Sequence, residues 1–283
     1  MGKTSKPVKN ADVRNFWEDN PVAASGIAAE PGTKDFYARF DTIREADDCE
    51  PYAYSNLIHG YSTSKDKKVL DVGCGNGYVL SRYGFEGAEV YGVDITWRAI
   101  DLSRQRFKFA SLQGNFQTTD GESLQFEDNF FDIACSMGVL HHIGNPRPMV
   151  DEMFRVLKPG GKIILMLYHR FSWKAVVILR LKRLCYPNYW GKSQQEALNM
   201  NDGEGCPLAL VYSKAEAREL LYKFEGHIIR LNQLSWKQLL LVTPLAHILK
   251  PLLPRQSDNV FARILGWNLY IEAKKPDNLS LNN

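Results

Sequence analysis

A glycine-rich turn between a short apolar run and a helical pattern constrains the fold of this chain more than any other feature. Residues 69–72 read Val-Leu-Asp-Val, residues 73–77 read Gly-Cys-Gly-Asn-Gly, and residues 78–83 carry apolar side chains at helical spacing. This order predicts a strand, a tight turn and a helix. Glycines let the backbone of such a turn adopt positive φ and come close to a bound ligand.

Strand and helix patterns alternate along the chain after this turn. Further strands are expected at 88–94, 130–136, 162–168, 227–231 and 267–273, and helices at 97–107 and 146–157. The last of these helices is expected to stop at the Lys-Pro-Gly-Gly sequence of residues 158–161. Alternation of this kind is typical of parallel βαβ units in a doubly wound sheet, whose ligands bind beyond the carboxyl ends of the strands.

Three segments exceed what a minimal sheet of this kind needs. We therefore expect an N-terminal helical cap (1–64), a core (65–170), a helical insertion or lid (171–212), and a C-terminal part (213–283) that completes the core and holds a second insertion (236–266). Within the lid, residues 172–186 have the mixture of apolar and basic side chains of an amphipathic helix. We expect all three additions to cover the same edge of the sheet.

Composition argues against several classes of protein. The formal net charge is only +3, and the five cysteines include no C-x-x-C pair. Strong nucleic-acid binding and a zinc ribbon are therefore not indicated. The first ten residues lack the apolar region of a signal peptide, and no apolar run reaches the ~20 residues of a membrane span. These features predict a cytoplasmic location.

Two aspartates near the turn indicate the kind of ligand it binds. Asp71 stands two residues before Gly73, where an acid would repel the pyrophosphate of a dinucleotide, and the glycine spacing is G-x-G-x-G instead of G-x-G-x-x-G. Such a site suits a ligand with cationic groups. Asp94 ends the second strand, where an acid accepts hydrogen bonds from ribose hydroxyls. A ribose together with a cationic amino-acid end points to S-adenosylmethionine.

Five motifs follow one another in the chain: VLDVGCGNG (69–77), YGVD (91–94), DGESLQF (120–126), FFDIACSMGVLHH (130–142) and RVLKPGG (155–161). Their series resembles class I S-adenosylmethionine-dependent methyltransferases of the type 11, ubiquinone/menaquinone-methyltransferase-like group. The resemblance implies an α/β fold: a Rossmann-like, doubly wound, mostly parallel seven-stranded sheet with an antiparallel last strand, plus helical cap elements. Gln125 departs from the family pattern, which usually has proline there.

The resemblance also implies which residues hold the cofactor. The glycines would line its methionine part, with Asp71 near the ammonium, and Asp94 would bind the ribose. Asp120 and the Gly121 backbone would hold the adenine. The full set of cofactor-binding candidates is Asp71, Gly73, Cys74, Gly75, Gly77, Asp94, Ile95, Asp120, Gly121, Glu122, Ser136 and Met137. The product would be S-adenosylhomocysteine.

Methyl transfer from a sulfonium mainly needs alignment and exclusion of water, and it needs a base only when the acceptor must lose a proton. The candidates for catalysis follow the fourth and fifth strands: His141, His142 and Tyr168. The candidates for substrate contact come from the cap and from the end of the fifth strand: Tyr37, Arg44, Tyr52, His169 and Arg170. Carboxylates that could hold Mg²⁺ are not found after the fourth strand, so no metal is predicted.

These features predict an S-adenosylmethionine-dependent methyltransferase that acts on a small organic acceptor, at oxygen, nitrogen, sulfur or carbon, in an enclosed pocket. No nucleic-acid partner is expected. Three alternatives stay open at this point: a lipophilic quinone or lipid acceptor reached by membrane contact through 172–186 or 236–253, a peptide or protein acceptor, and a non-catalytic cofactor-binding subunit. The sequence does not indicate the oligomeric state.

Overall fold

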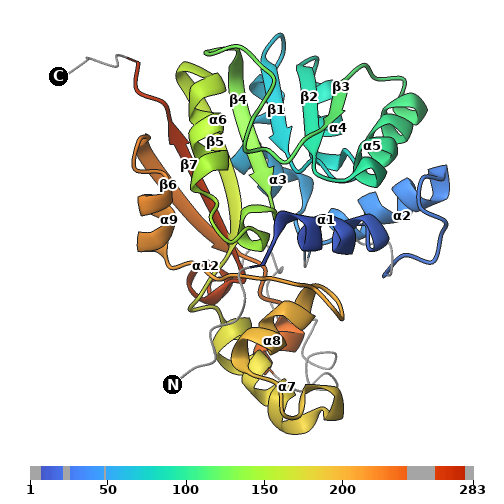
Figure 1. The fold of residues 1–283 in the computed structure, drawn as a ribbon, viewed down its shortest axis with the longest axis vertical. Helices are drawn as coiled ribbons and strands as arrows, with labels where there is room; N and C mark the ends of the chain where they lie inside the picture. The colour runs from blue at the N-terminus through green and yellow to red at the C-terminus, as the bar shows by residue number, and fades with distance from the viewer. Residues whose placement is uncertain (1–7, 22–25, 48, 241–258, 278–283) are drawn as a thin grey trace.

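The computed structural model describes residues 8–21, 26–47, 49–240 and 259–277, which build a seven-stranded sheet (Figure 1). The strands are β1 (Lys68–Val72), β2 (Glu89–Asp94), β3 (Asn115–Thr118), β4 (Phe131–Met137), β5 (Leu157–Tyr168), β6 (Glu225–Asn232) and β7 (Asn268–Lys274), in the spatial order β3-β2-β1-β4-β5-β7-β6. Strands β1 to β5 pair in parallel, and β7 is antiparallel to both neighbours. The predicted fold class, including its antiparallel last strand, is confirmed.

The strand order reverses between β1 and β4, because the chain first runs outward through β2 and β3 and then crosses to the other side of β1. At such a reversal the loops after the two central strands diverge to opposite faces and leave a crevice at their carboxyl ends. The glycine turn follows β1, so the topology alone brings it to this crevice.

Helices cover both faces of the sheet. One face carries α4 (Tyr78–Phe85) and α5 (Trp97–Ala110), and the other carries α6 (Arg147–Val156) and α9 (Lys214–Leu220). Side chains alternate along each strand, so Val69 packs in the buried cluster under α4 and α5, whereas Leu70 packs in the cluster under α6 and α9. Both faces are apolar, as a parallel sheet between two helical layers requires.

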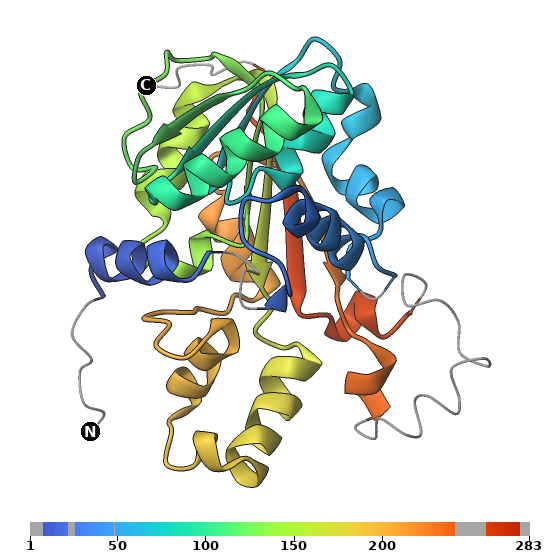
Figure 2. The same ribbon diagram turned by 90° about the vertical axis from the view of Figure 1, so that its right-hand side faces the viewer.

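The N-terminal helices divide between two places. Helix α1 (Asn10–Asp19) lies at the carboxyl ends of the strands, whereas α2 (Lys34–Arg44) and α3 (Tyr52–His59) lie beside α4 and α5 (Figure 2). The expectation that all additions cover one edge is therefore wrong for α2 and α3. Phe36 and Ile58 are buried in the cluster under α4 and α5, so these helices extend the layer on that face.

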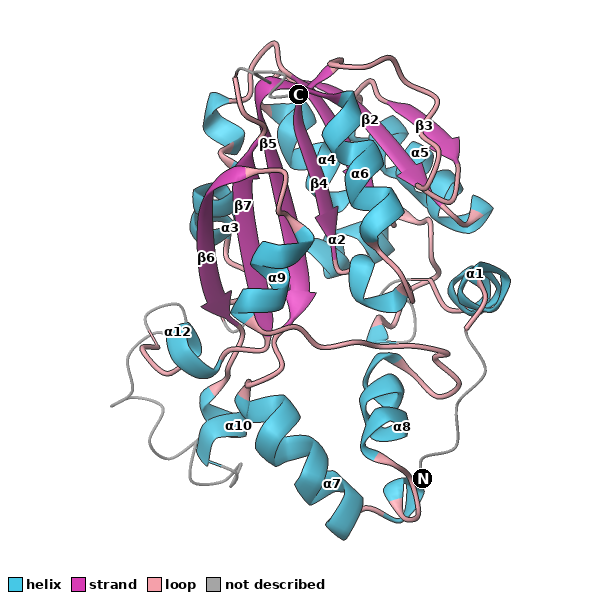
Figure 3. Ribbon diagram, turned by 60° about the vertical axis from the view of Figure 1, so that its left-hand side comes forward, coloured by secondary structure: helices cyan, strands magenta, loops and turns pink. Residues whose placement is uncertain are grey.

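The insertion after β5 does lie beyond the carboxyl ends of the strands (Figure 3). The predicted amphipathic segment is helical: a π-helical turn at Lys174–Ile178 continues into α7 (Leu179–Cys185), and α8 (Gln194–Asn199) and a 3-10 helix (Met200–Asp202) follow. The chain then returns to the sheet, where the Leu210 amide donates to the His141 carbonyl (2.7 Å) and the Tyr212 amide to the Tyr168 carbonyl (2.8 Å). These bonds fasten the insertion to the ends of β4 and β5.

The second insertion is described only at its two ends, α10 (Trp236–Leu240) and α12 (Ala262–Leu265). Residues 241–258 lie outside the described residues, and with them most of the 236–253 segment. Among the residues that are described, no helix is long and apolar enough to cross a membrane. The division of the chain into four parts stays a prediction.

Candidate active site

A cleft with an empty volume of about 950 Å³, including its open mouth, lies at the carboxyl ends of β1, β2 and β4 and is bordered by α1. It is the place where the strand order reverses. Nine residues named from the sequence line it: Gly73, Gly75, Asp94, Ile95, Asp120, Gly121, Glu122, Met137 and His142.

The glycine turn forms the floor of this cleft. Gly73, Gly75 and Gly77 all have positive φ (82°, 55° and 76°), which residues with a Cβ rarely adopt. A Cβ on Gly73 would lie 2.2 Å from the Cγ2 atom of Val139, so only glycine fits against this neighbour. Gly77 does not line the cleft and packs instead against Ser103 of α5. The first two glycines thus shape the cleft, and the third brings α4 and α5 together.

Asp94 lies in the cleft wall and is held by three donors. Its Oδ2 accepts from the Gly75 amide (3.1 Å), and its Oδ1 accepts from the amide (3.0 Å) and the hydroxyl (2.9 Å) of Thr96. Burial raises the pKa of this carboxyl, and the three donors oppose that effect. Oδ1 already accepts two hydrogen bonds, whereas Oδ2 accepts one and keeps a free lone pair. Asp94 can therefore accept a further hydrogen bond from a ligand hydroxyl group.

Asp71 lies below the turn, 2% exposed, and does not itself line the cleft. Its Oδ1 has no hydrogen-bond partner among the described residues. Burial, with a smaller contribution from the negative charge of Asp94, raises the pKa of Asp71 to about 7. A buried carboxylate oxygen without a partner is costly, and a cationic group near the turn would offset that cost. The acid therefore fits a ligand that carries an ammonium or sulfonium.

The loop after β3 forms the opposite wall. Asp120 accepts from the Glu122 amide (3.1 Å), and Gly121 has a φ of 78° and lies so close to Met149 that a Cβ would be 2.5 Å from its Cε. Asn10 of α1 donates to the Glu122 carboxylate (3.1 Å), which ties α1 to this wall.

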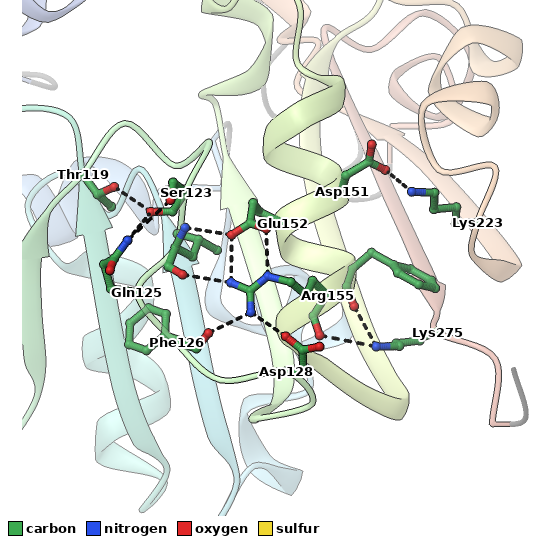
Figure 4. Close-up of polar contacts among 12 residues, drawn as sticks. Thr119, Ser123, Gln125, Phe126, Asp128, Asp151, Glu152, Arg155, Lys223 and Lys275 are labelled. Atoms are coloured by element: carbon green, nitrogen blue, oxygen red, sulfur yellow. Dashed lines mark hydrogen bonds and ion pairs between the residues drawn. The ribbon is translucent and has the colours of Figure 1, made fainter.

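Arg155 of α6 holds the far part of the same loop (Figure 4). Its guanidinium donates to the carbonyls of Leu124 (2.9 Å) and Phe126 (2.8 Å), to both carboxylate oxygens of Glu152, and to Asp128 (2.7 Å). Glu152 in turn accepts from the Leu124 amide (2.8 Å). One side chain thus fixes the backbone that follows the Asp120–Glu122 wall.

Two of the cofactor candidates, Ser136 of β4 and Cys74 of the glycine turn, are buried and lie outside the cleft. The Ser136 hydroxyl donates to the Val72 carbonyl (2.8 Å). The Cys74 thiol lies 3.6 Å from the Ser103 hydroxyl, and burial raises its pKa well above its usual value. Cys74 is therefore a packing residue, as the sequence analysis expected, and not a nucleophile.

His142 is the predicted catalytic residue that reaches the cleft. Its Nδ1 lies 2.6 Å from the Leu208 carbonyl oxygen. Because a carbonyl can only accept, Nδ1 carries the proton and Nε2 is left with a free lone pair in the neutral ring. Burial lowers the pKa of His142, against the opposing effect of Asp202, so the neutral ring predominates at pH 7. Trp17 of α1 packs edge-on against this ring, at 5.0 Å between centroids.

His141 and Tyr168 lie behind the cleft wall, and neither lines the cleft. The two rings stack at 3.6 Å, and Tyr168 continues the stack onto Trp267 at 4.2 Å. The Tyr168 hydroxyl donates to Asp202. Neither nitrogen of His141 has a partner among the described residues, and burial lowers its pKa well below the usual range. His141 and Tyr168, both catalytic candidates from the sequence, are therefore not brought to the cleft.

The three cap residues expected to contact substrate lie elsewhere. Tyr37 donates to a backbone carbonyl of α5 (2.7 Å), Arg44 forms a buried ion pair with Glu50 (2.6 Å), and Tyr52 donates to Glu86 at the surface (3.0 Å). These residues do not reach the cleft because α2 and α3 pack on a face of the sheet and not over the carboxyl ends of its strands.

The two residues after β5 are likewise engaged in structural contacts and do not line the cleft. The His169 Nδ1 lies 3.2 Å from the Gly266 carbonyl, and Arg170 pairs with Glu216 of α9 (2.6 Å). They join β5 to the neighbouring segments.

Helix α1 also contributes to the cleft, where it places Asn10, Val13 and Trp17, and this was not predicted from the sequence. A signal was present, because Val13, Phe16 and Trp17 follow helical i, i+3, i+4 spacing. That spacing indicates an apolar helix face but does not say what the face covers. Thr96, whose hydroxyl and amide hold Asp94, was likewise not predicted from the sequence.

Residues 70–165 match the sequence profile of a protein family described as methyltransferase domain. This part of the chain is therefore similar to members of that family. Ubiquinone biosynthesis O-methyltransferases resemble it: the one from Coxiella burnetii is 36% identical over 108 residues, which are 38% of this chain and 46% of that protein. The one from Azoarcus sp. is 33% identical over 114 residues, 40% of this chain and 49% of that protein. The matches thus span about half the length of these curated relatives.

Solved structures with the same fold include a S-adenosylmethionine-dependent methyltransferase from Methanosarcina mazei (TM-score 0.54, 22% identity, covering 78% of this chain and 98% of that one). Magnesium protoporphyrin IX methyltransferase from Synechocystis, solved with S-adenosylhomocysteine, has a TM-score of 0.56 at 14% identity and covers 94% of this chain and 100% of that one. The [4+2]-cyclase SpnF also shares the fold (0.52, 17%, covering 80% and 82%). The described part of the chain therefore has the same Rossmann-like fold as these structures, and the fold alone does not determine the reaction.

Proposed function

We propose that this protein transfers a methyl group from S-adenosylmethionine to a hydroxyl oxygen of a small organic acceptor and releases S-adenosylhomocysteine. One observation carries the proposal: the glycine turn, Asp94 and the 120–122 loop meet in a single cleft under α1, and beneath it lies the buried Asp71, whose Oδ1 has no partner among the described residues. This set of groups matches a ribose on one side and a cationic amino-acid end on the other.

S-adenosylmethionine would supply an activated methyl group on a sulfonium. The chain would bind the ribose at Asp94 and the adenine between Gly121 and Ile95, while Val13 and Trp17 of α1 exclude water. Because the donor is already activated, alignment and water exclusion are the main contributions that the protein must make.

His142 would act as the general base. Its Nδ1–H bond to Leu208 leaves Nε2 free to take a proton, and burial keeps the ring neutral near pH 7. A base is useful when the acceptor is a hydroxyl, which must lose its proton as the new bond to carbon forms. The names of the matched relatives, which are O-methyltransferases, support the same acceptor atom.

The test uses purified protein, methyl-labelled S-adenosylmethionine and a fractionated cell extract. We expect label in the small-molecule fraction with wild type, and loss of both labelling and S-adenosylhomocysteine binding by calorimetry with Asp94→Ala. Asp35→Asn, which alters an exposed carboxylate on α2, is the matched control and should behave as wild type. Label confined to the macromolecular pellet would favour a peptide or protein acceptor. Binding of S-adenosylmethionine without any labelling would favour a non-catalytic subunit.

A second proposal concerns the acceptor's polarity, and it rests on the outer end of the insertion. Leu184 (74% exposed), Trp190 (61% exposed) and Tyr186 stand there beside Arg180 and Arg183. Exposed apolar side chains among basic ones suit an anionic membrane surface, which would give access to a lipophilic acceptor. Co-sedimentation with vesicles containing phosphatidylglycerol, but not with neutral phosphatidylcholine vesicles, would support this proposal. The cytoplasmic location stays a prediction.

A further inference from the structure

The return segment of the insertion packs against His142 from the side away from the cleft. Besides the Leu208 carbonyl, it brings the Cys206 thiol to 4.0 Å from Nδ1, and a carboxylate oxygen of Asp202, the Cys206 Sγ and a ring nitrogen of His142 all lie within 4.8 Å of one another. Because Nδ1 donates its proton to Leu208, it has no lone pair there for a metal ion. These groups therefore do not form a metal site, and their effect on His142 is through charge.

Asp202 is held firmly but is only half satisfied. Its Oδ1 accepts from the Tyr168 hydroxyl and from the Asn201 side chain (3.4 Å), while its Oδ2 is buried and has no partner among the described residues. Tyr168 is itself stacked between His141 and Trp267, so the carboxylate is anchored to a rigid group. Its charge is thus kept close to His142.

We propose that Asp202 is a positioning residue for the reaction proposed above, whose carboxylate stabilises the protonated ring of His142 and thereby sets the pH range in which that ring accepts a proton from the acceptor. This inference deepens the proposed function and rests on it. It makes the insertion part of the chemical site, because Asp202 and Leu208 both come from that segment.

The groups that face His142 from each packed element support an effect of Asp202. His141, its neighbour in the same turn, is kept neutral by burial, which lowers its pKa well below the usual range. Burial raises the pKa of Cys206 to about 12 and that of Tyr168 well above its usual value, so both are neutral near pH 7. Trp17 of α1 carries no charge. Asp202 is therefore the charged side chain that raises the pKa of His142 against burial.

One cation lies near the same carboxylate. The ammonium of Lys174 sits 4.7 Å from the centre of the Trp267 ring, and burial lowers its pKa to about 8 although the charge of Asp202 opposes this. The Trp267 ring that it contacts lies 4.2 Å from the Tyr168 ring, whereas His142 meets Tyr168 edge-on at 6.2 Å between ring centroids. The positive charge of Lys174 thus partly offsets the negative charge of Asp202.

The experiment compares Asp202→Asn with wild type by histidine-labelled NMR titration in the presence of S-adenosylhomocysteine. The chain has six histidines, and His142→Gln assigns the signal. The pKa of His142 should move to lower pH in Asp202→Asn, because a stabiliser of the protonated ring is removed. The acid limb of methyl transfer should move the same way, and the rate plateau should fall on the order of tenfold, a part of the ~10²–10⁴-fold that a general base contributes.

Two variants make the test specific. Glu204→Gln removes an exposed carboxylate two residues away and should leave the pKa of His142 and the pH profile unchanged. Asp202→Glu keeps the charge and should restore the pKa at least in part. An unchanged His142 pKa in Asp202→Asn, with S-adenosylhomocysteine affinity as in wild type, would overturn the inference. If wild type transfers no methyl group at all, the proposed function fails, yet the titration still decides whether Asp202 acts on His142.

Discussion

Arg155 is a single side chain whose hydrogen bonds hold the backbone beside the cleft wall. The variant Arg155→Lys keeps the positive charge but replaces a planar group with five donors by a compact ammonium. A lysine cannot reach the Leu124 and Phe126 carbonyls and both oxygens of Glu152 together (Figure 4). The substitution therefore tests the hydrogen-bond geometry and not the charge.

The expected loss can be worked from the contacts. The two bonds to backbone carbonyls contribute about 1 kcal/mol each. The side chains of Arg155 and Glu152 are 32% and 21% exposed, and their bidentate ion pair adds about 1 kcal/mol. The contact with Asp128 adds little, because that carboxylate is 68% exposed. Lysine recovers part of this total, so we expect Arg155→Lys to lower the free energy of unfolding by about 2 kcal/mol.

Urea unfolding of the whole chain and calorimetric binding of S-adenosylhomocysteine measure the two consequences. Stability should fall as stated, and affinity should fall severalfold because the backbone after Asp120–Glu122 is less firmly held. Lys223→Met, which breaks the surface pair with Asp151 on the same helix, is the control and should change either quantity little. A loss below about 0.5 kcal/mol for Arg155→Lys, with affinity unchanged, would refute the reasoning, since surface substitutions away from such networks stay in that range.

Three further predictions concern the same site. Gly73→Ala should destabilise the fold by roughly 2–5 kcal/mol, because strain at positive φ and overpacking against Val139 add up, and Val139→Ala in the same chain should recover part of that loss in urea unfolding. Burial raises the pKa of Asp71 to about 7, so binding of an ammonium-bearing ligand at pH 7 should release about half a proton. Calorimetry in buffers of different ionisation enthalpy should detect this release, and Asp71→Asn should abolish the release. The hydrogen bonds from Arg155 lower the pKa of Glu152, so this pair stabilises the fold at pH values above the normal carboxyl pKa and loses that effect as the pH falls. The difference in unfolding free energy between wild type and Arg155→Lys should therefore shrink on going from pH 7 to pH 3.

The elements of the core could be predicted because each carries its own local signal. The strands at 68–72, 89–94 and 131–137 are apolar runs between turn signals, and helix α6 ends at Val156, just before the Lys-Pro-Gly-Gly sequence. The structure departs from the expectation at the next step, because residues 157–161 continue the line of β5 and the Gly160 amide donates to the Lys275 carbonyl (2.9 Å). Residues 157–161 are extended because they pair with a segment that is distant in the sequence.

Strand β3 was missed for a physical reason. It is four residues long, Asn-Phe-Gln-Thr, and lies at the edge of the sheet, so only one of its sides pairs with a neighbour. Its pattern contains a single large apolar residue, Phe116, which packs on Phe107 of α5 at 4.8 Å. A short polar segment of this kind becomes a strand through its register with β2 and not through its own propensity.

The two halves of the cleft differ in the same way: one is determined by local sequence and the other by contacts with a distant segment. On the cofactor side, Gly73, Gly75 and Asp94 lie within a single βαβ unit, so their spacing in the sequence already determines their spacing in space. On the side proposed to face the acceptor, His141 and His142 are adjacent in one turn, and local sequence cannot say which ring faces the cleft. The choice is made by the insertion: the Leu210 amide binds the carbonyl of His141, and the Leu208 carbonyl binds the ring of His142. Changes in residues 202–210 should therefore alter the acceptor chemistry while leaving cofactor binding intact, which is the opposite of what substitutions at Arg155 should do.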